Sequence, residues 1–147
     1  MNFILTLKQR NKMKIFEVKV RYTRNCGDNA KHVKETYIVK DETCAGVEKL
    51  IAEELKAFAD GSIEVYGIKE INVYDFVNTT SAEKIFLCKV DLITIQDNGN
   101  EVRKPVKIYV GSETLEGARK EISAYLSNLD CQLMAVSETK ICEIYLQ

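Results

Sequence analysis

The residue types that most often carry catalysis are few and scattered in this sequence. The single histidine, His32, lies beside Lys31 and Lys34 near the start of an expected strand. No spacing supplies the partners that a nucleophilic triad or a zinc site needs. Glu53 and Glu54 are adjacent on an expected helix, where neighbouring positions do not face each other and make a poor acid–base pair. No glycine loop of a common phosphate-binding type is present. We therefore predict no catalytic residues, no metal and no cofactor, and hence a protein that is not an enzyme.

The cysteine content is typical of a reduced, cytoplasmic protein. The sequence has five cysteines and no CxxC pair, so neither a disulfide framework nor a zinc site is expected. We expect Cys44, Cys88 and Cys142 in the core, where a thiol behaves as a small apolar side chain, and Cys26 in a hairpin loop. No stretch reaches the roughly 18 apolar residues of a membrane span. The opening residues 1–7 have neither the basic leader nor the cleavage site of a signal peptide. A cytoplasmic location without membrane contact follows.

Basic side chains gather in the N-terminal part of the chain, although the formal net charge is −1. Any site for a polyanion must therefore be local. The candidate nucleic-acid-binding residues lie on the first expected hairpin and are Lys19, Arg21, Arg24, Lys31 and Lys34. Lys19, Arg21 and Lys34 are expected on its outward face, where cations can neutralise the phosphates of a single strand. Tyr22 and Tyr37, which could stack bases, are expected to point inward.

A second unusual surface is the outward face of the second expected hairpin, which is apolar. Its candidate partner-binding residues are Ile85, Leu87, Ile93 and Tyr109. An apolar sheet face is normally covered. The cover could be the N-terminal arm, another subunit of a homodimer or a different protein partner, and the sequence favours none of these three.

The secondary-structure elements that would position these residues can be predicted from a seven-residue motif that the chain contains twice. The stretch Lys14–Val20 reads KIFEVKV, and Lys84–Val90 reads KIFLCKV. Such self-similarity indicates a repeat architecture. Further identities follow in one register after the first hairpin, pairing Thr43 with Thr114, Gly46 with Gly117, Ile51 with Ile122, Leu55 with Leu126, Val65 with Val136, Lys69 with Lys140 and Tyr74 with Tyr145. We interpret this internal sequence repeat as a tandem duplication.

Each copy contains the pattern of a strand hairpin, a helix and a further extended segment. Residues 14–24 alternate at period two, as a half-buried strand does, and a second strand follows at 31–40. Asp41 is expected to cap a helix that ends at Asp60–Gly61, with Cys44, Val47, Ile51, Leu55 and Phe58 on its buried stripe. Residues 63–76 return as extended chain, with a bulge or bend at Gly67.

The second copy repeats this plan with strands at 84–95 and 102–110. Ser112 is expected to cap its helix, which runs to about Leu129 and precedes extended chain at 132–146. Pro105 predicts an edge position or a bulge for its strand. Gly46 and Gly117, at matching helical positions, suggest close packing of one helix against the other.

The fold class predicted from this pattern is α+β, a tandem duplication of a ββαβ(β) unit with mostly antiparallel sheet and two helices packed on it about a pseudo-twofold axis. We expect a single domain at 13–147, made of two repeats (13–78 and 83–147) that share one core. Residues 1–12 form an N-terminal arm outside the repeats. Met13 directly precedes the first copy, so either Met1 or Met13 could be the true start.

Four segments carry a family resemblance: Lys19–Tyr22, Tyr37–Val39, Ile68–Glu70 and Ala135–Tyr145. With these segments the chain resembles a family of small proteins of unknown function from anaerobic bacteria and tailed phages, over about Ile15 to Tyr145. The resemblance implies a phage or mobile-element setting. It brings no catalytic residues with it.

Two functions from different classes are predicted. The first is a non-catalytic accessory protein that binds single-stranded nucleic acid or another polyanion through the basic hairpin face. The alternative is a protein-interaction module, either a host-factor inhibitor or a homodimer, that uses the apolar face of the second hairpin. A small-nucleotide pocket between the repeats is a third possibility that the sequence leaves open.

Overall fold

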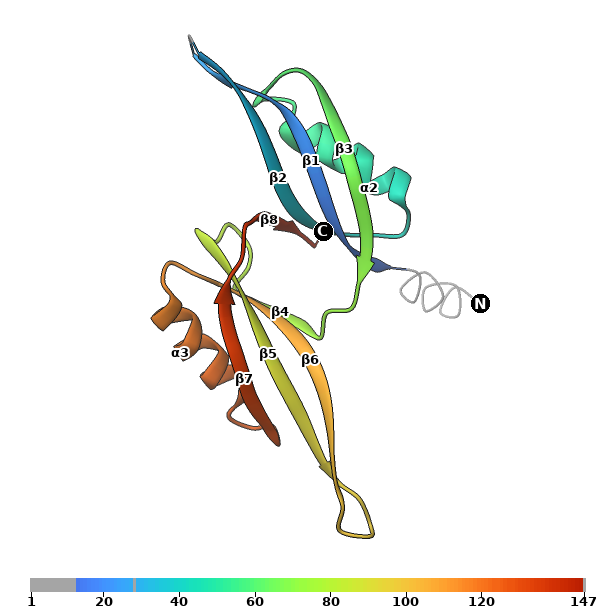
Figure 1. Cartoon of the computed structure of the whole chain (residues 1–147), viewed down its shortest axis with the longest axis vertical. Helices are drawn as coiled ribbons and strands as arrows, with labels where there is room; N and C mark the ends of the chain where they lie inside the picture. The colour runs from blue at the N-terminus through green and yellow to red at the C-terminus, as the bar shows by residue number, and fades with distance from the viewer. Residues whose placement is uncertain (1–12, 28, 147) are drawn as a thin grey trace, which may run out of the picture. The chain divides into compact units, whose positions relative to one another are not determined.

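The computed structural model describes residues 13–27 and 29–146 (Figure 1). It divides into two compact units. Unit 1 comprises the chain up to Ile71 together with Ile144 onward, and unit 2 runs from Asn72 to Glu143. The expected arm at residues 1–12 and the side chain of Cys26 lie outside the described part.

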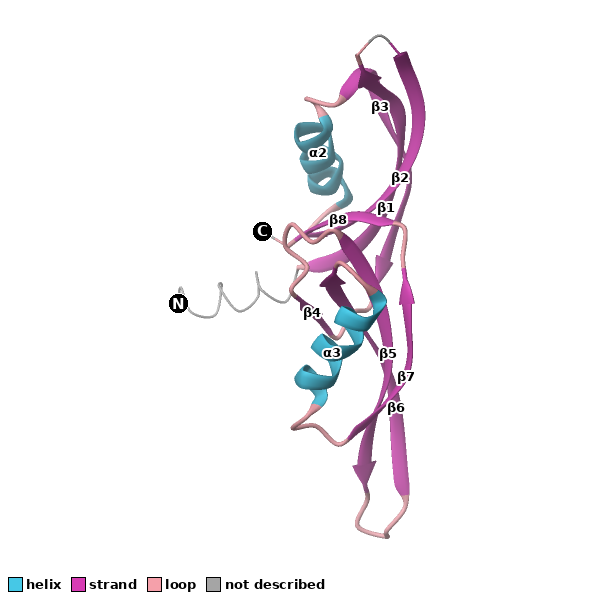
Figure 2. Ribbon diagram, turned by 90° about the vertical axis from the view of Figure 1, so that its left-hand side faces the viewer, coloured by secondary structure: helices cyan, strands magenta, loops and turns pink. Residues whose placement is uncertain are grey.

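Unit 1 is a four-stranded sheet with one helix on one of its faces (Figure 2). Its elements are β1 (Lys14–Cys26), β2 (Asn29–Asp41), α2 (Cys44–Leu55) and β3 (Ala59–Ile71). The fourth strand of its sheet is β8 (Ile141–Tyr145), of which Ile144 and Tyr145 belong to unit 1. The strand order is β3-β1-β2-β8, and β1 pairs antiparallel with both β2 and β3. The predicted first hairpin is therefore confirmed, with β1 at the centre of the sheet.

Unit 2 has the same construction. Its elements are β4 (Asp75–Val77), β5 (Lys84–Ile95), β6 (Glu101–Ser112), α3 (Leu115–Leu126) and β7 (Cys131–Glu138). The strand order is β4-β6-β5-β7. β5 pairs antiparallel with β6 and β7, whereas β4 pairs parallel with β6. The predicted α+β class and the two similar halves are thus confirmed.

The alternation of apolar and polar residues explains each sheet. In β1 the side chains of Val18 and Val20 are fully buried and face Val47, Ile51 and Leu55 of the helix stripe. In unit 2 a corresponding cluster joins β5 and β6 to α3. The buried side chains that the helices cover therefore form two clusters, one in each unit, and the prediction that both helices share one core is wrong.

The fourth strand of each sheet comes from the other sequence repeat. β4 follows β3 in the first repeat but pairs with β6, and β8 ends the second repeat but joins the sheet beside β2. The α3 side chains hold both ends of β4, since Tyr125 donates a hydrogen bond to Asp75 at 2.5 Å and Asn78 donates one to Glu121 at 2.8 Å. The boundaries of the compact units consequently differ from those of the repeats.

Each sheet has a bulge at an equivalent position. Lys19 is opposite Gly67 and Val20 is opposite Val65, so Tyr66 has no partner on β1. In unit 2, Lys89 is opposite Ala135 and Val90 is opposite Leu133, which leaves Met134 without a partner in the same way. The bulge predicted near Gly67 is confirmed.

The bulges correct the alignment of the two repeats. Val65 is equivalent to Leu133 rather than to Val136, and Ile68, opposite Val18, is equivalent to Val136, opposite Cys88. The sequence register is therefore right through the helices and wrong after them. The extra residues of the first repeat lie at the start of β3, where its pairing with β1 is irregular between Tyr22 and Arg24.

The helix caps differ from the prediction by two residues in both repeats. Thr43 and Thr114 are the N-caps, and their hydroxyls accept hydrogen bonds from the backbone N–H of Gly46 and Gly117, each at 3.0 Å. Asp41 instead accepts from the N–H groups of Glu42 and Thr43 at 2.7 and 3.3 Å. A threonine at the cap position is extended and satisfies a free N–H of the first turn.

The two helical glycines are explained by this cap rather than by packing between helices. A Cβ at Gly46 would occupy the position of the Asp41 carboxylate, and one at Gly117 would meet the hydroxyl of Ser112. Both positions favour glycine because a side chain from the preceding loop lies against the first helical turn and would have to move to admit a Cβ.

The structure corrects the expectations for Phe58, Cys44 and Cys142 and confirms those for Cys88 and Pro105. The helix α2 ends at Leu55 and β3 begins at Ala59, so Phe58 lies outside the buried stripe and is 46% exposed. Cys44 and Cys142 are exposed, whereas Cys88 is buried as predicted. The edge position of Pro105 is confirmed, because β4 pairs only with Ile108 to Val110 of β6 and does not reach the proline.

Candidate functional site

The candidate site is the outer face of the unit 1 sheet, defined here as the face opposite α2. Residues that are direct partners across strands point to the same side of a sheet. Lys19 has Thr36 and Gly67 as its partners, and Arg21 has Lys34 and Glu64. Because their β1 neighbours Val18 and Val20 face α2, these side chains lie on the outer face.

The structure brings together three of the five predicted nucleic-acid-binding residues. Lys19, Arg21 and Lys34 are exposed on the outer face. Arg24 and Lys31 are partners of each other and share the side of the sheet on which Tyr22 is buried. The predicted set is therefore divided between two faces.

Arg21 is fixed by a carboxylate on the next strand. Its Nε and Nη2 donate to the two carboxylate oxygens of Glu64 at 2.7 and 2.8 Å. These hydrogen bonds and the attraction between the charges raise the pKa of Arg21 and lower that of Glu64 from their usual values. Such a bidentate pair sets the orientation of the guanidinium plane. Because both side chains are about half exposed, its main consequence is geometric.

Tyr66 is the residue of this face that sequence reasoning missed. It is the unpaired residue of the β3 bulge and is 42% exposed. The Arg21 guanidinium carbon lies 5.3 Å from the centre of its ring and the Lys34 ammonium 6.0 Å from it, both cation–π contacts. Gly67, directly after Tyr66, was the available signal, since a glycine in a strand often marks a bulge.

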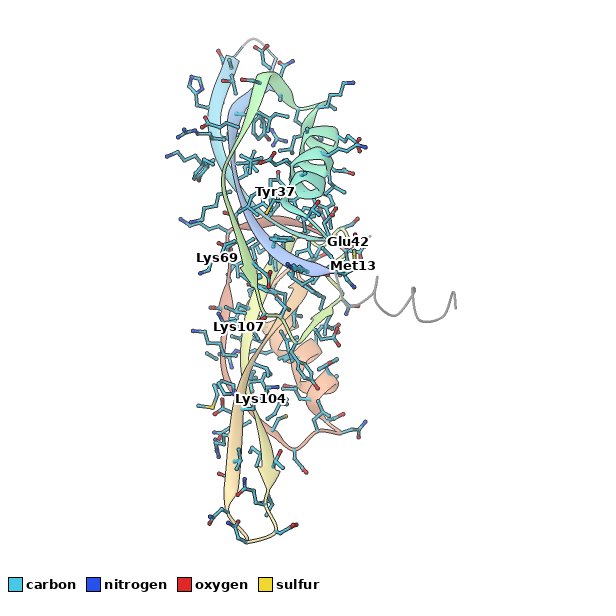
Figure 3. The ribbon with its side chains drawn as sticks, turned by 90° about the vertical axis from the view of Figure 1, so that its right-hand side faces the viewer. Met13, Tyr37, Glu42, Lys69, Lys104 and Lys107 are labelled. Atoms are coloured by element: carbon cyan, nitrogen blue, oxygen red, sulfur yellow. The ribbon has the colours of Figure 1, made fainter. Side chains whose placement is uncertain are left out.

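The aliphatic part of Lys19 lies over Gly67. An added Cβ at that glycine would be 3.5 to 3.9 Å from three carbons of the lysine side chain. Lys69 lies on the same side of the strands, away from α2 (Figure 3). Within the described ranges, neither Lys19 nor Lys34 has an ion-pair partner. Five cations on this face, Lys19, Arg21, Lys34, Lys40 and Lys69, therefore stand against the carboxylates of Glu17 and Glu64.

The equivalent face of unit 2 has a different chemistry. Lys89 corresponds to Lys19, but Asp91 stands at the position of Arg21, Pro105 at that of Lys34 and Met134 at that of Tyr66. Asp91 is paired with Arg103 at 3.6 Å. In the part of the chain that the structure describes, the cluster of two lysines, an arginine and a tyrosine is thus a property of unit 1.

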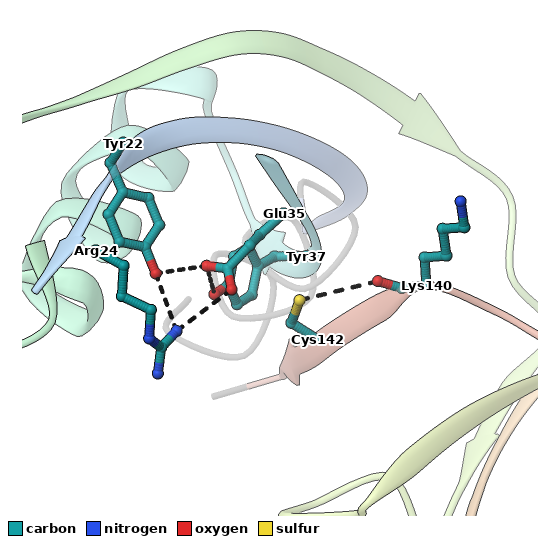
Figure 4. A network of polar contacts seen from close by, with 6 residues as sticks. All are labelled: Tyr22, Arg24, Glu35, Tyr37, Lys140 and Cys142. Atoms are coloured by element: carbon teal, nitrogen blue, oxygen red, sulfur yellow. Dashed lines mark hydrogen bonds and ion pairs between the residues drawn. The ribbon is translucent and has the colours of Figure 1, made fainter. Parts of the chain in front are cut away.

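A second polar cluster lies on the helix side of the unit 1 sheet (Figure 4). The carboxylate of Glu35 accepts hydrogen bonds from Tyr22 at 2.6 Å, Tyr37 at 2.9 Å and Arg24 at 3.4 Å. Burial and the hydrogen bond to Glu35 raise the pKa of Tyr22 to about 12. The ring of Tyr145 in β8 stacks on Tyr37, with centroids 6.0 Å apart.

Arg24 takes part in this cluster on the helix side of the sheet. Its guanidinium also lies 5.0 Å from the centre of the Phe58 ring and 3.3 Å from the hydroxyl of Tyr22. The figure also shows the Cys142 thiol donating to the Lys140 carbonyl oxygen at 3.8 Å. Tyr22, Tyr37 and Arg24 satisfy the Glu35 carboxylate at the margin of an apolar core.

The apolar face predicted as the alternative binding surface is largely covered. Ile85 is 2% and Tyr109 6% exposed, and Leu87 and Ile93 are half-buried. The ring of Phe76 in β4 stacks on that of Tyr109 at 5.9 Å. The chain itself therefore buries two of the four predicted partner-binding residues, and a protein-interaction role for this face stays a prediction.

Residues 13–27 and 29–146 contain neither a metal-binding cluster nor a membrane-spanning helix. No group of three or more histidine, cysteine or acidic side chains in these ranges could hold a metal ion. No helix among them is long and apolar enough to cross a membrane.

Comparison with known proteins gives a family and no activity. No curated protein matches the chain. A family model described as "Domain of unknown function (DUF4494)" matches residues 14–147, which include every strand and helix described above. The match extends over nearly the whole chain, and the protein therefore belongs to the DUF4494 family of unknown function.

Proposed function

We propose that this chain is a non-catalytic accessory protein of a phage or mobile element that binds single-stranded nucleic acid or another polyanion in the cytoplasm. The binding surface is the outer face of the unit 1 sheet. The observation that carries the proposal is the cluster of Lys19, Arg21 and Lys34 around the exposed ring of Tyr66. The setting follows from the family resemblance of the sequence.

The geometry of the face supports contact with a chain of phosphates. Lys19 and Arg21 are two positions apart on β1, and Lys34 lies beside Arg21 on β2, so the cations are spaced by about 5 to 7 Å. Lys19 and Lys34 have no ion pair within the described ranges, which leaves their ammonium groups open to phosphate oxygens. A cluster of cations beside an aromatic ring suits a single strand.

The charge of the whole chain sets the expected strength. With a formal net charge of −1, no long-range field assists the encounter, and affinity depends on the few contacts of this face. Binding should therefore be weak at physiological salt and clearly measurable only at low ionic strength.

A salt titration with a short, labelled single-stranded oligonucleotide tests the proposal. The wild-type protein should bind at low salt, with log K falling linearly against log salt by about 0.7 per phosphate contact. Replacing both Lys19 and Lys34 with alanine should weaken binding and reduce this slope by about 1.4. Fluorescence anisotropy gives both quantities.

The second unit provides the matched control. Lys89 and Lys107 are partners across β5 and β6, and both are exposed. Replacing this pair with alanine removes the same charge, and binding should stay close to that of the wild type. The proposal fails if the wild type does not bind at low salt, or if the two double variants weaken binding equally.

A further inference from the structure

The bulge in β3 presents Tyr66 on the outer face of unit 1. Because Tyr66 has no partner on β1, its ring is set apart from the paired rows of side chains and is 42% exposed. An exposed tyrosine ring has a π face on which a base can stack, whatever the base is. A polyanion without bases has no planar group that could stack on this ring.

Arg21 contacts this ring in a fixed orientation. Its guanidinium carbon is 5.3 Å from the ring centre, and the bidentate bonds to Glu64 define the direction of the guanidinium plane. Planar guanidinium groups also stack on bases. Arg21 and Tyr66 together are therefore two adjacent planar groups, each close to half exposed.

The same pairing makes Arg21 a poor phosphate ligand. Glu64 already occupies two of its N–H donors and balances its charge. Lys19 and Lys34 have no such partner within residues 13–27 and 29–146. Neutralisation of phosphate thus falls to the two lysines, and Arg21 is left with a stacking role.

We infer that Tyr66 and Arg21 form a base-stacking subsite, and that the ligand of the outer face is a single-stranded nucleic acid rather than a polyanion without bases. This inference rests on the proposed function, which by itself includes both kinds of ligand. It assigns Lys19 and Lys34 to the phosphates, Tyr66 and Arg21 to a base, and Glu64 to positioning Arg21.

Two probes with the same phosphates separate the inference from the proposed function. One is a short oligothymidylate, and the other is an abasic strand of equal length. The wild type should bind the thymidine strand about tenfold more tightly at low salt, the contribution expected of one stacked base. Tyr66→Ala should remove this preference and leave binding of the abasic strand unchanged, whereas Tyr66→Phe should retain it.

Glu64→Gln provides a second readout. Removing the carboxylate releases the Arg21 guanidinium and adds one positive charge to the face. The abasic strand should then bind more tightly, and the preference for the thymidine strand should decrease. Met134→Ala, at the equivalent bulge of unit 2, is the matched control and should change neither probe.

The outcomes distinguish the two claims. If the wild type binds both strands equally, or if Tyr66→Ala weakens both by the same factor, the stacking inference is wrong and the polyanion-binding function stands. If neither strand nor inorganic polyphosphate binds at low salt, both are wrong. Circular dichroism of each variant verifies that the fold is intact.

Discussion

On β1, Arg21 and Arg24 are three positions apart and therefore point to opposite faces of the sheet. The side of the sheet on which Lys19, Arg21 and Lys34 lie followed from period two. The same alternation places Arg24 with Tyr22, on the opposite face. Period two therefore already separates Arg24 from the cations of the outer face. Tyr66 is different, because a bulge resets the alternation and its position on the strand cannot be read from sequence alone.

The hydroxyl of Tyr22 is expected to contribute measurably to stability. It donates a hydrogen bond to Glu35 at 2.6 Å in a half-buried site. Tyr22→Phe removes this donor and should lower the free energy of unfolding by about 1 to 2 kcal/mol at neutral pH. Urea denaturation followed by circular dichroism measures the difference, and Tyr66→Phe, at an exposed tyrosine, is the control that should change it little.

The pH dependence of this difference has a definite sign. Burial and the hydrogen bond to Glu35 raise the pKa of Tyr22 from its usual value of 10.0 to about 12 on folding, so the folded state holds its phenolic proton more tightly than the unfolded state. The contribution is complete below pH 10 and decreases as the pH rises toward 12. A stability difference between wild type and Tyr22→Phe that grew above pH 10 would contradict this assignment.

At the scale of elements, the hairpins and helices were predictable and their ends were not. The buried stripe of Val47, Ile51 and Leu55 has the helical period and identified α2. The start was misplaced because Asp41 and Thr43 are both good N-cap residues. Only the backbone shows that Thr43 caps the helix, while the Asp41 carboxylate accepts from the loop N–H groups.

This arrangement predicts a strong coupling between Asp41 and Gly46. Alanine at position 46 gains about 1 kcal/mol of helix propensity, but its Cβ displaces the Asp41 carboxylate from its hydrogen bonds. Gly46→Ala should therefore be neutral or destabilising in the wild type and stabilising in the Asp41→Ala background. A double-mutant cycle by urea denaturation measures the coupling.

The second repeat offers a matched pair for this cycle. Ser112 occupies the position of Asp41, and its hydroxyl lies where a Cβ at Gly117 would be. We expect a coupling of the same sign but smaller, because the hydrogen bond from the Thr114 N–H to the Ser112 hydroxyl is 3.4 Å long. Additive effects in both repeats would show that Asp41 and Ser112 are not the reason for glycine at positions 46 and 117.

At the scale of the whole molecule, the sequence indicated two similar halves but not which strands each sheet contains. β4 has three residues and β8 has five. Segments this short have too little periodicity to identify their partners. Their placement depends on contacts far away in sequence, such as the Tyr125 hydroxyl on Asp75 and the ring of Tyr145 on Tyr37.

The strand composition predicts where a C-terminal substitution acts. Tyr145 is at the end of the second repeat but packs on the core cluster of unit 1. Tyr145→Ala should remove about 2 kcal/mol of packing and increase hydrogen exchange in β1 and β2, while β5 and β6 keep their protection. Mass spectrometry of peptic fragments locates the change.

Phe76 serves as the reciprocal control. It lies in the first repeat but stacks on Tyr109 of unit 2, so Phe76→Ala should deprotect β5 and β6 instead. If each substitution loosened the repeat in which it occurs along the chain, the strand assignment would be wrong.

Because β4 and β8 each lie in the sheet of the other repeat, one repeat expressed alone would lack the fourth strand of its own sheet. A polypeptide carrying one copy would fold three long strands and a helix, and the side of β2 or β6 that β8 or β4 occupies would be left with unpaired backbone groups. Each half-length polypeptide would contain a short strand of its own, but that strand follows β3 or β7, which lies at the opposite edge of the sheet. Two such half-length chains could each donate that strand to the other, which makes a mutually interlocked homodimer the natural single-copy counterpart of this fused protein.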